Sequence, residues 1–407
     1  MNIAILGAGA SGIFAALHAA QSDVTVTLFE QNDTIGKKLL VTGSGRCNLT
    51  NDHVSAQAYT CNNPQWLEIL LNNYNTSDLI NKLNTLGIPT YKTDDGWYYP
   101  LSNSAHSVVN TLSQAVHDKN IQLFTSSRVI YIVKQNQGFN VSYQKDDQSN
   151  HEGYFDRVVV SSGGKSYPTL GSNGEIYPVL KNLGHTIISV KPALAPIIAD
   201  LGSLKPMKGI RLDAGTKLIK NKSILASAAG NLIFTDWGLN GPAVMDISHH
   251  IPYPVDAPIQ LSLNLLFYNF EAFTDLLDKK RQTDFGLINL LEAFFPPKAA
   301  HCLVAYLGYL KSSKLCDLDQ NEINSIVNTL KDIRLSVSGV RGYRHCQSSS
   351  GGVPIDEVNP RTLESNINPG LYLTGETLDV VGPCGGYNLH FAFASGSLAG
   401  QAAGKTI

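Results

Sequence analysis

Apolar and polar residues at the start of the chain alternate in blocks that predict a strand, a helix and a second strand. Asn2–Leu6 is a short apolar run, Ile13–Gln21 is rich in alanine and typical of a helix, and Val24–Phe29 is β-branched. A glycine-rich turn at residues 7–12 separates the first strand from the helix. This order predicts a β-α-β unit of about thirty residues.

The same periodicities predict further elements up to about residue 190. The spacing of apolar residues favours helices over Pro64–Leu86 and His106–Lys119. Alternating or continuous apolar runs predict four strands, with a turn near residues 136–138: Ile121–Phe124, Arg128–Lys134, Gly138–Gln144 and Asp156–Ser161.

Beyond Lys191 the pattern changes twice before α/β character returns. Prolines interrupt short strand-like segments to about residue 265, and a helical pattern then runs to Ile333, broken at Pro296-Pro297. Leu335–Ser338 again suits a strand. Residues 371–374 form an apolar strand, and Tyr387–Gly404 is helical in character. The sequence therefore predicts α/β segments at both ends with an inserted region between them.

Composition excludes several classes of protein. The 407 residues carry a formal net charge of −2, so attraction to nucleic acid or an anionic membrane is not expected. No apolar stretch approaches the roughly 20 residues needed to cross a bilayer. The six cysteines are scattered without a CxxC pair, which argues for a reducing compartment and against a disulfide reductase. We therefore expect a cytoplasmic protein that is a monomer or a weak homo-oligomer.

The turn Gly7-Ala8-Gly9-Ala10-Ser11-Gly12 fits the dinucleotide pattern G-x-G-x-x-G in the required context. The first glycine makes a tight turn, the second lets the backbone approach a pyrophosphate, and the third lets helix and strand pack closely. The helix N-terminus offers N–H groups to the phosphates. Glu30 ends the second strand, where a carboxylate accepts hydrogen bonds from the ribose hydroxyls and repels a 2′-phosphate. The turn therefore predicts FAD or NAD rather than NADP.

The long insertion distinguishes FAD from NAD. A strand leads into Gly163-Gly164 and another into Gly375-Glu376, and these two segments bracket the insertion. Two-domain flavoproteins are built in this way. We expect Glu376 and Asp379 near the ribityl chain or the pyrophosphate. The helix that follows Gly385-Gly386 would point its partial positive charge at the flavin.

Several stretches resemble one family, the bacterial BaiN-type and aminoacetone-oxidase-type FAD-dependent flavoproteins. The resemblance runs from Asn2 to about Gly404 and is weakest at residues 260–330. It rests on five segments of the sequence: 36–51 (GKKLLVTGSGRCNLTN), 163–168 (GGKSYP), 238–243 (GLNGPA), 357–360 (EVNP) and 370–389. Within the last segment the matching residues are 370–372 (GLY), 375–376 (GE), Asp379 and 385–389 (GGYNL).

The resemblance implies an α/β fold: a glutathione-reductase-like (Rossmann-type) FAD-binding domain with an inserted β-rich domain and a small helical domain. We place the FAD-binding domain at residues 1–190 and 345–407, the β-rich insert at 191–264 and 334–344, and the helical insert at 265–333.

The family also implies that Arg46, Cys47 and Asn48 lie along the cofactor. Arg46 suits a phosphate or a flavin carbonyl, and Asn48 suits the pyrimidine edge. Lys37 and Lys38 are equally compatible with a solvated surface, and Cys47 is more typical of a packed residue than of a nucleophile. The predicted cofactor-contacting residues are Gly7, Gly9, Ala10, Ser11, Gly12, Glu30, Gln31, Lys37, Lys38, Thr42, Gly45, Arg46, Cys47, Asn48, Val129, Gly163, Gly164, Gly375, Glu376, Asp379, Gly385, Gly386, Tyr387 and Asn388.

The chain departs from the family pattern at three places. Trp97 and Ser104 stand where basic residues are common, which favours a neutral substrate or one unlike that of the relatives. Residues 175–177, Glu-Ile-Tyr, lack a usual glycine, so this loop is expected to differ.

No catalytic acid or base is identified from the sequence. Weak candidates are His390, Tyr387, Tyr167 and Cys384, each of which is also compatible with a packing role. His249-His250 lacks a third ligand at suitable spacing, so no metal site is predicted. Arg341, Arg344 and His345 form a basic cluster that suits an anionic substrate, a nicotinamide phosphate or a solvated face.

The electron partner and the reaction class stay open at this point. No second G-x-G-x-x-G follows a strand, so NAD(P)H would dock only transiently, and oxygen is an alternative acceptor. We expect an FAD-dependent oxidoreductase acting on a small molecule. The alternatives are an FAD-containing RNA-modifying enzyme and a non-enzymatic flavin-binding protein.

Overall fold

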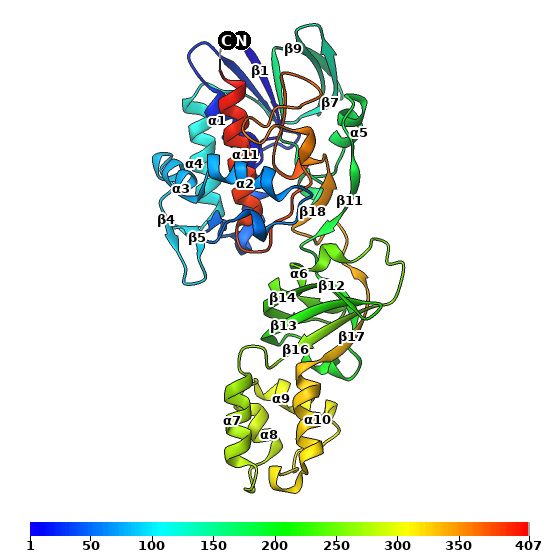
Figure 1. The fold of residues 1–407 in the computed structure, drawn as a ribbon. Coiled ribbons are helices and arrows are strands. Elements are labelled where there is room, and N and C mark those ends of the chain that lie inside the picture. The colour runs from blue at the N-terminus through cyan, green and yellow to red at the C-terminus, as the bar shows by residue number, and fades with distance from the viewer. Residues whose placement is uncertain (406–407) are drawn as a thin grey trace. The chain divides into compact units, whose positions relative to one another are not determined.

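The computed structural model describes residues 1–405 and divides the chain into two compact units (Figure 1). The first unit consists of Met1–Lys191 and Gln347–Ile407, and the second of Pro192–Cys346. Strand β11 (Ile188–Ala193) runs across the boundary in the sequence. Within residues 1–405, every helix is too short or too polar to span a membrane.

A five-stranded parallel sheet forms the centre of the first unit, in the order β19-β10-β1-β2-β6. Most residues of the inner strands are buried without alternation, as in parallel sheets covered on both faces. The strands are β1 (Asn2–Leu6), β2 (Thr25–Phe29), β6 (Gln122–Phe124), β10 (Arg157–Val160) and β19 (Leu371–Leu373). Because β19 pairs with β10, both ends of the chain build one sheet, and the predicted Rossmann-type α/β fold is confirmed.

Helices α1 (Ala10–Ala19) and α11 (Tyr387–Ala403) lie side by side in the first unit (Figure 1). A Cβ atom placed on Gly396, Gly400 or Gly404 would lie 2.1, 2.2 or 2.8 Å from carbonyl oxygens of α1 and its C-terminal end. Only glycine therefore permits this approach, and its spacing of four residues keeps one bare face of α11 against α1. The contact ties the last helix of the chain to the first.

The remaining elements of the first unit surround this core. A three-stranded sheet β3-β5-β4 and another, β7-β8-β9, are antiparallel, and β11 pairs with β18. Their bounds are β3 (Thr50–Asn51), β4 (Thr90–Lys92), β5 (Trp97–Pro100), β7 (Ser127–Gln135), β8 (Gly138–Lys145), β9 (Asn150–Phe155) and β18 (Ser348–Gly352); the helices are α2 (Pro64–Asn73), α3 (Thr76–Thr85), α4 (Ala105–Asp118) and α5 (Ile176–Asn182).

The second unit contains a closed six-stranded barrel and a group of helices. The barrel has the order β12-β15-β14-β13-β16-β17, and every pair in it is antiparallel. Its strands are β12 (Ile197–Asp200), β13 (Arg211–Lys220), β14 (Ser223–Phe234), β15 (Gly238–Asn240), β16 (Ile259–Asn264) and β17 (Ile333–Val340); the helices are α6 (Pro242–Met245), α7 (Phe270–Lys280), α8 (Leu287–Glu292), α9 (Pro297–Tyr306) and α10 (Gln320–Lys331).

Most predicted elements are present with ends shifted by a few residues. The predicted helix at Ile13–Gln21 begins earlier, at Ala10, and the region Pro64–Leu86 divides into α2 and α3 at Tyr74-Asn75. β9 and the β3-β5-β4 sheet were not predicted. β9 has the largely polar sequence NHEGYF although it pairs with the neighbouring β8, and β3 and β4 have only two and three residues, so each leaves little local signal.

Candidate functional site

The glycine turn between β1 and α1 has one face open and the other closed. A Cβ on Gly12 would lie 1.8 Å from the carbonyl oxygen of Gly7, so the turn and the helix are in direct backbone contact. A Cβ on Gly9, in contrast, would meet nothing within 4 Å. No side chain caps α1 at Gly9, and Ala10 and Ser11 form its first turn. Space and N–H groups for a pyrophosphate therefore coincide at Gly9.

Glu30 lies at the end of β2 and is fixed from two sides. Its Oε2 accepts a hydrogen bond from the Ala8 backbone N–H at 2.8 Å. Its Oε1 accepts from the backbone and side-chain nitrogens of Asn32 at 2.9 and 2.6 Å. Gln31 donates to the carbonyl of Gly171, which brings the 168–171 turn against this strand end. Glu30 is thus oriented before any ribose binds.

Lys37 and Lys38 differ in their surroundings. Lys37 pairs with the exposed carboxylate of Asp33 at 2.8 Å, four residues earlier in the chain. Lys38 points inward and pairs with Glu376 and with the hydroxyl of Ser166. The alternative of a solvated surface charge therefore describes Lys37 better than Lys38.

Glu376 is the centre of a hydrogen-bond network that joins four segments of the first unit. Besides Lys38, its carboxylate accepts from the Ser166 hydroxyl at 2.7 Å and from the backbone and hydroxyl of Ser349 at 2.8 and 2.7 Å. A Cβ on Gly164 would lie 2.2 Å from the Ser349 Oγ, so the Gly163-Gly164 turn closes over the network. The sequence analysis missed Ser166 and Ser349, because neither carries a distinctive signal of its own.

The loop at residues 42–48 has an unusual backbone. Gly43, Ser44, Gly45 and Cys47 have φ values of 54°, 57°, 83° and 63°, in the left-handed region. The Thr42 hydroxyl donates to Leu39 O at 2.7 Å, and the Cys47 N–H donates to Thr42 O at 3.1 Å. The Arg46 N–H likewise donates to Gly43 O at 3.2 Å, so these N–H groups hold the loop in its shape.

Arg46 projects from this loop onto an aromatic ring. Its guanidinium carbon lies 4.3 Å from the centre of the Tyr99 ring, and Nη2 donates to the Tyr99 hydroxyl at 3.3 Å. Stacking restricts the guanidinium while most of its donors stay available. Tyr99 was not predicted as a site residue; its position in the segment Gly96–Pro100 was the only signal.

Cys47 and Asn48 end the loop. Cys47 is fully buried, and burial raises the pKa of its thiol to about 12, so it is a neutral packed residue and not a nucleophile. Asn48 is buried, and its side-chain amide, turned so that the nitrogen faces the carbonyl oxygens of Thr50 and Tyr98, donates to them at 3.1 and 3.3 Å. Val129, further away in the sequence, is half-buried on β7 opposite Tyr143.

The turn at residues 382–388 places the N-terminus of α11. Asn388 Oδ1 accepts from the Gly382 N–H at 2.9 Å, and its Nδ2 donates to Gly382 O at 2.8 Å, which closes the turn. Asn51 Nδ2 donates to Gly385 O at 3.0 Å. A Cβ on Gly386 would lie 2.6 Å from Thr50 O, so β3 and this turn are in close contact. The segments around residues 50 and 385 are therefore in direct contact.

The catalytic candidates take different positions around that turn. His390 is fully buried on α11, its Nδ1 lies 2.8 Å from the Thr50 hydroxyl, and burial lowers its pKa to about 4. Tyr387 accepts a hydrogen bond at its backbone oxygen from Tyr59, 2.8 Å away. Tyr167 has a left-handed backbone, with φ of 54°, beside the Ser166 network. His390 is thus neutral near pH 7 and packed in the interior.

Gly375 and Asp379 frame the other side of the network. The Gly375 N–H donates to the Ser395 hydroxyl of α11 at 3.0 Å, and a Cβ on Gly375 would lie 2.8 Å from the Ser11 Oγ of α1. Asp379 Oδ1 accepts from the Gly351 N–H at 2.6 Å. Gly375 therefore packs against α1 and α11, whereas Asp379 is held by the segment of β18.

These features fit FAD. The side of Gly9 that a Cβ would fill is free, Glu30 is fixed at the end of β2, and no side chain caps α11 at Gly386. Two helix N-termini can receive the phosphates and the flavin carbonyls, and the guanidinium of Arg46 offers further donors. In residues 1–405 no group of three or more His, Cys, Asp or Glu side chains is arranged to hold a metal ion.

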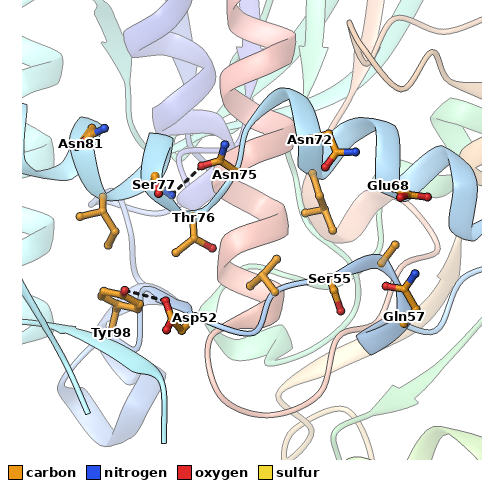
Figure 2. A pocket seen from close by; sticks show the side chains of 14 residues that line it. Asp52, Ser55, Gln57, Glu68, Asn72, Asn75, Thr76, Ser77, Asn81 and Tyr98 are labelled. Carbon is orange, nitrogen blue, oxygen red and sulfur yellow. Dashed lines mark hydrogen bonds between the residues drawn. The ribbon is translucent and has the colours of Figure 1, made fainter. Parts of the chain in front are cut away.

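A separate pocket of about 560 Å³ lies between helices α2 and α3 and the segment after β3 (Figure 2). Its rim is polar, with Asp52, Glu68 and Asn72 among its members, and Tyr98 lies at one end. Asp52 accepts from Lys92 at 2.8 Å and from the Tyr98 hydroxyl at 3.1 Å. None of the predicted cofactor residues lines this pocket.

The three departures from the family pattern take up ordinary structural contacts. A Cβ on Gly385 would lie 3.0 Å from the Trp97 Nε1, so the indole packs on the turn before α11. Ser104 caps α4 by accepting from the Ser107 N–H at 3.3 Å. Glu175 precedes α5, and the hydroxyl of Tyr177 donates to Glu376 O at 3.2 Å.

Known proteins resemble the chain over almost its full length. It is 34% identical to the 3-dehydro-bile acid delta(4,6)-reductase of Clostridium scindens, covering 99% of both chains. It is 30% identical to the ribosomal RNA dihydrouridine synthase of Escherichia coli, covering 96% of this chain and 95% of the other. The fold is similar to that of a 3-ketosteroid-delta4-(5alpha)-dehydrogenase from Rhodococcus jostii, with a TM-score of 0.50, 12% identity, and coverage of 99% and 96%.

A family match completes these comparisons. Residues 1–402 match the family described as HI0933-like protein Rossmann domain. The match includes the glycine turn, the loop at residues 36–51 and the returning segment at residues 370–389. The chain therefore belongs to the HI0933-like Rossmann family, the flavoprotein family that its motifs indicated.

Proposed function

We propose that the protein is an FAD-dependent oxidoreductase that acts on a small molecule. The observation that carries this proposal is the open space at Gly9 in the glycine turn, next to the fixed carboxylate of Glu30. The chain is also 34% identical to a reductase over 99% of its length. When bound, FAD supplies the two-electron redox chemistry. The protein has to bind, orient and shield it.

The chain's own residues suit distinct parts of that task. The Gly9 turn and the start of α1 would bind the pyrophosphate, and Glu30 would accept hydrogen bonds from the ribose hydroxyls. Arg46, stacked on Tyr99, and the N-terminus of α11 supply positive charge where a reduced flavin carries negative charge. The Glu376 carboxylate, which pairs with Lys38, would accept hydrogen bonds from hydroxyl groups of the ribityl chain.

The substrate class proposed is a small, uncharged organic molecule with a reducible or oxidisable carbon–carbon bond next to a carbonyl group. The Clostridium scindens relative reduces a 3-dehydro bile acid by its name, which supports the bond type but not the absence of charge, since a bile acid carries a carboxyl group. Trp97 packs at the turn before α11, where a basic residue would favour an anion. The electron partner is NAD(P)H docking transiently, with oxygen as the alternative.

An RNA substrate is the second candidate function. It is favoured by the 30% identity to the Escherichia coli dihydrouridine synthase. The net charge of −2 speaks against it, because RNA-binding surfaces are basic. A gel-shift titration with ribosomal RNA fragments distinguishes the two: retention at physiological salt supports the RNA substrate.

The cell compartment and the assembly state belong to the same proposal. All six cysteines are free, which supports a reducing, cytoplasmic location. A monomer or weak homo-oligomer is proposed and is tested by light scattering of the purified protein.

Anaerobic reduction of the purified protein tests the main proposal. The protein should be yellow, and NADH or NADPH should bleach its flavin absorbance; enone and amine substrates are then screened for reoxidation or reduction. A protein that stays colourless after incubation with FAD contradicts the cofactor, and a flavin that no donor or substrate changes favours the non-enzymatic alternative.

A further inference from the structure

Cationic and aromatic side chains gather in the second unit at the turn that follows β17. The guanidinium carbon of Arg341 lies 4.8 Å from the centre of the Trp237 ring, and its Nη2 lies 2.6 Å from the Nε2 of His345. The rings of Tyr253 and Tyr343 meet edge to face at 5.9 Å. Arg341 is therefore held in one orientation by an indole on its face and an imidazole at its edge.

The two arginines of this turn have no acidic partner within ion-pair distance among residues 1–405. Some other cations of the second unit are paired: Lys220 with Asp256, Lys314 with Asp284 and Arg334 with Asp332. The nearby carboxylate of Asp236 forms its ion pair with Lys208 at 3.0 Å and interacts with Arg341 only at longer range. The positive charge of the turn is thus only partly offset by the protein.

His345 completes the cluster as a neutral donor. Partial burial, followed by the nearby charges of Arg341 and Arg344, holds the pKa of His345 below its usual value. Its Nε2 accepts the hydrogen bond from Arg341, so the proton of the neutral ring is on Nδ1. That N–H adds a third donor group to those of the two guanidinium groups.

We propose that this turn binds the phosphate-bearing part of a nicotinamide nucleotide. Arg344 and His345 would bind the phosphate, and the free face of Arg341 would stack on the adenine ring, since a guanidinium stacks on planar rings and matches phosphate oxygens. The inference rests on the proposed function and names the reductant of that reaction. A nucleotide fits this cluster better than a simple carboxylate does. A carboxylate would use only the two cations, whereas a nucleotide would also use the surface on which a planar ring can stack.

Binding of adenosine 2′,5′-bisphosphate and of AMP to the FAD-loaded full chain tests this site. Calorimetry gives the dissociation constant, and tryptophan fluorescence reports on Trp237, with Trp237→Phe assigning the signal. We expect saturable binding that Arg344→Gln weakens about tenfold or more, because it removes a charged hydrogen bond. Arg281→Gln, which removes an arginine at the end of α7, should change the dissociation constant less than about twofold.

A second variant separates stacking from charge. Arg341→Lys keeps the cation but loses the planar group, so we expect weaker binding of the adenine nucleotides and little change for inorganic phosphate. Retained flavin absorbance and an unchanged unfolding temperature show that each variant is folded. Equal binding of phosphate and the adenine nucleotides would contradict the stacking role of Arg341.

The failure of this site and the failure of the proposed function give different results. If NADPH or NADH bleaches the flavin with an unchanged KM in Arg344→Gln, the site is wrong and the oxidoreductase remains. If the adenine nucleotides bind through Arg344 but neither reductant bleaches the flavin, the nucleotide site remains and the electron donor is wrong. No saturable binding at all overturns the site.

Discussion

The two units bury their strands in different ways. In the first unit, β1, β2 and β10 are buried at every position after the first, because helices and loops cover both faces of the parallel sheet. In the second unit, β17 alternates buried and exposed residues along most of its length, because a barrel strand has one face inside and one outside. The two units also differ in the contacts that restrict which residues they can contain.

In the first unit the tightest backbone contacts fall on glycines at the ends of strands and on the face of α11 that meets α1. Glycines are easily recognised in a sequence, and those at strand ends coincide with the candidate cofactor site. In the second unit most constraints are pairings between strands as distant as β12 and β17, and the motif at residues 238–243 marks only the close contacts of Gly238 with β12 and of Gly241 with β14. Substitutions that act on one unit at a time test this contrast.

Gly12→Ala should have the largest effect. The new Cβ would lie 1.8 Å from the carbonyl oxygen of Gly7, so either the turn or α1 must move. We expect the first unit to lose more than about 4 kcal/mol of stability and the protein to lose its flavin. Flavin absorbance after gel filtration and chemical denaturation measure both. Wild-type flavin content together with wild-type stability would mean that this backbone contact is misplaced.

Gly238→Ala is the matching change in the second unit. Gly238 has φ of 145°, and a Cβ there would lie 2.3 Å from Ile197 O across the β12-β15 pair. We expect a loss of about 3–4 kcal/mol in the second unit with flavin retained by the first. Calorimetry and limited proteolysis follow the second unit, and absorbance follows the first.

A control for that change lies close by in the sequence. Gly209 has φ of 86° with open space around its Cβ position, so Gly209→Ala should lose only about 1 kcal/mol through backbone strain. Loss of flavin in Gly238→Ala but not in Gly209→Ala would show that the two units unfold together, against the contrast drawn above.

The predictable part of the molecule follows this contrast. The β1-α1-β2 unit and the contribution of both chain ends to one Rossmann-type domain were predictable from apolar runs and glycine motifs. Barrel closure was not, because its pairs join residues far apart in the sequence, and β9 was not, because its sequence NHEGYF is largely polar. Within the site, the Tyr99 ring under Arg46 and the serines around Glu376 were missed, since their roles arise only from tertiary contact.

Lowering the pH should destabilise the first unit, because the buried imidazole of His390 is held in its neutral form. Burial lowers the pKa of His390 to about 4, below its value of 6.5 in the unfolded chain. Its contribution is fully present above pH 6.5 and is lost as the pH falls from 6.5 to about 4, by about 3 kcal/mol in total. His390→Gln should flatten the pH dependence of unfolding over that range. An unchanged slope would mean that His390 is already protonated or exposed.

Gly9→Leu should have the smallest effect on the fold and yet remove the cofactor. Gly9 has an ordinary φ of −82°, and its Cβ position is open, so the apoprotein should lose about 1 kcal/mol or less, mainly through a poorer helix cap. The leucine would occupy the space assigned to the pyrophosphate, and FAD affinity should fall about 100-fold or more. Gly45→Leu tests another predicted cofactor glycine in an open position, but its φ of 83° adds strain in the apoprotein. Stable apoprotein with normal FAD binding in Gly9→Leu would place the pyrophosphate elsewhere and would leave Gly12 with a purely structural role.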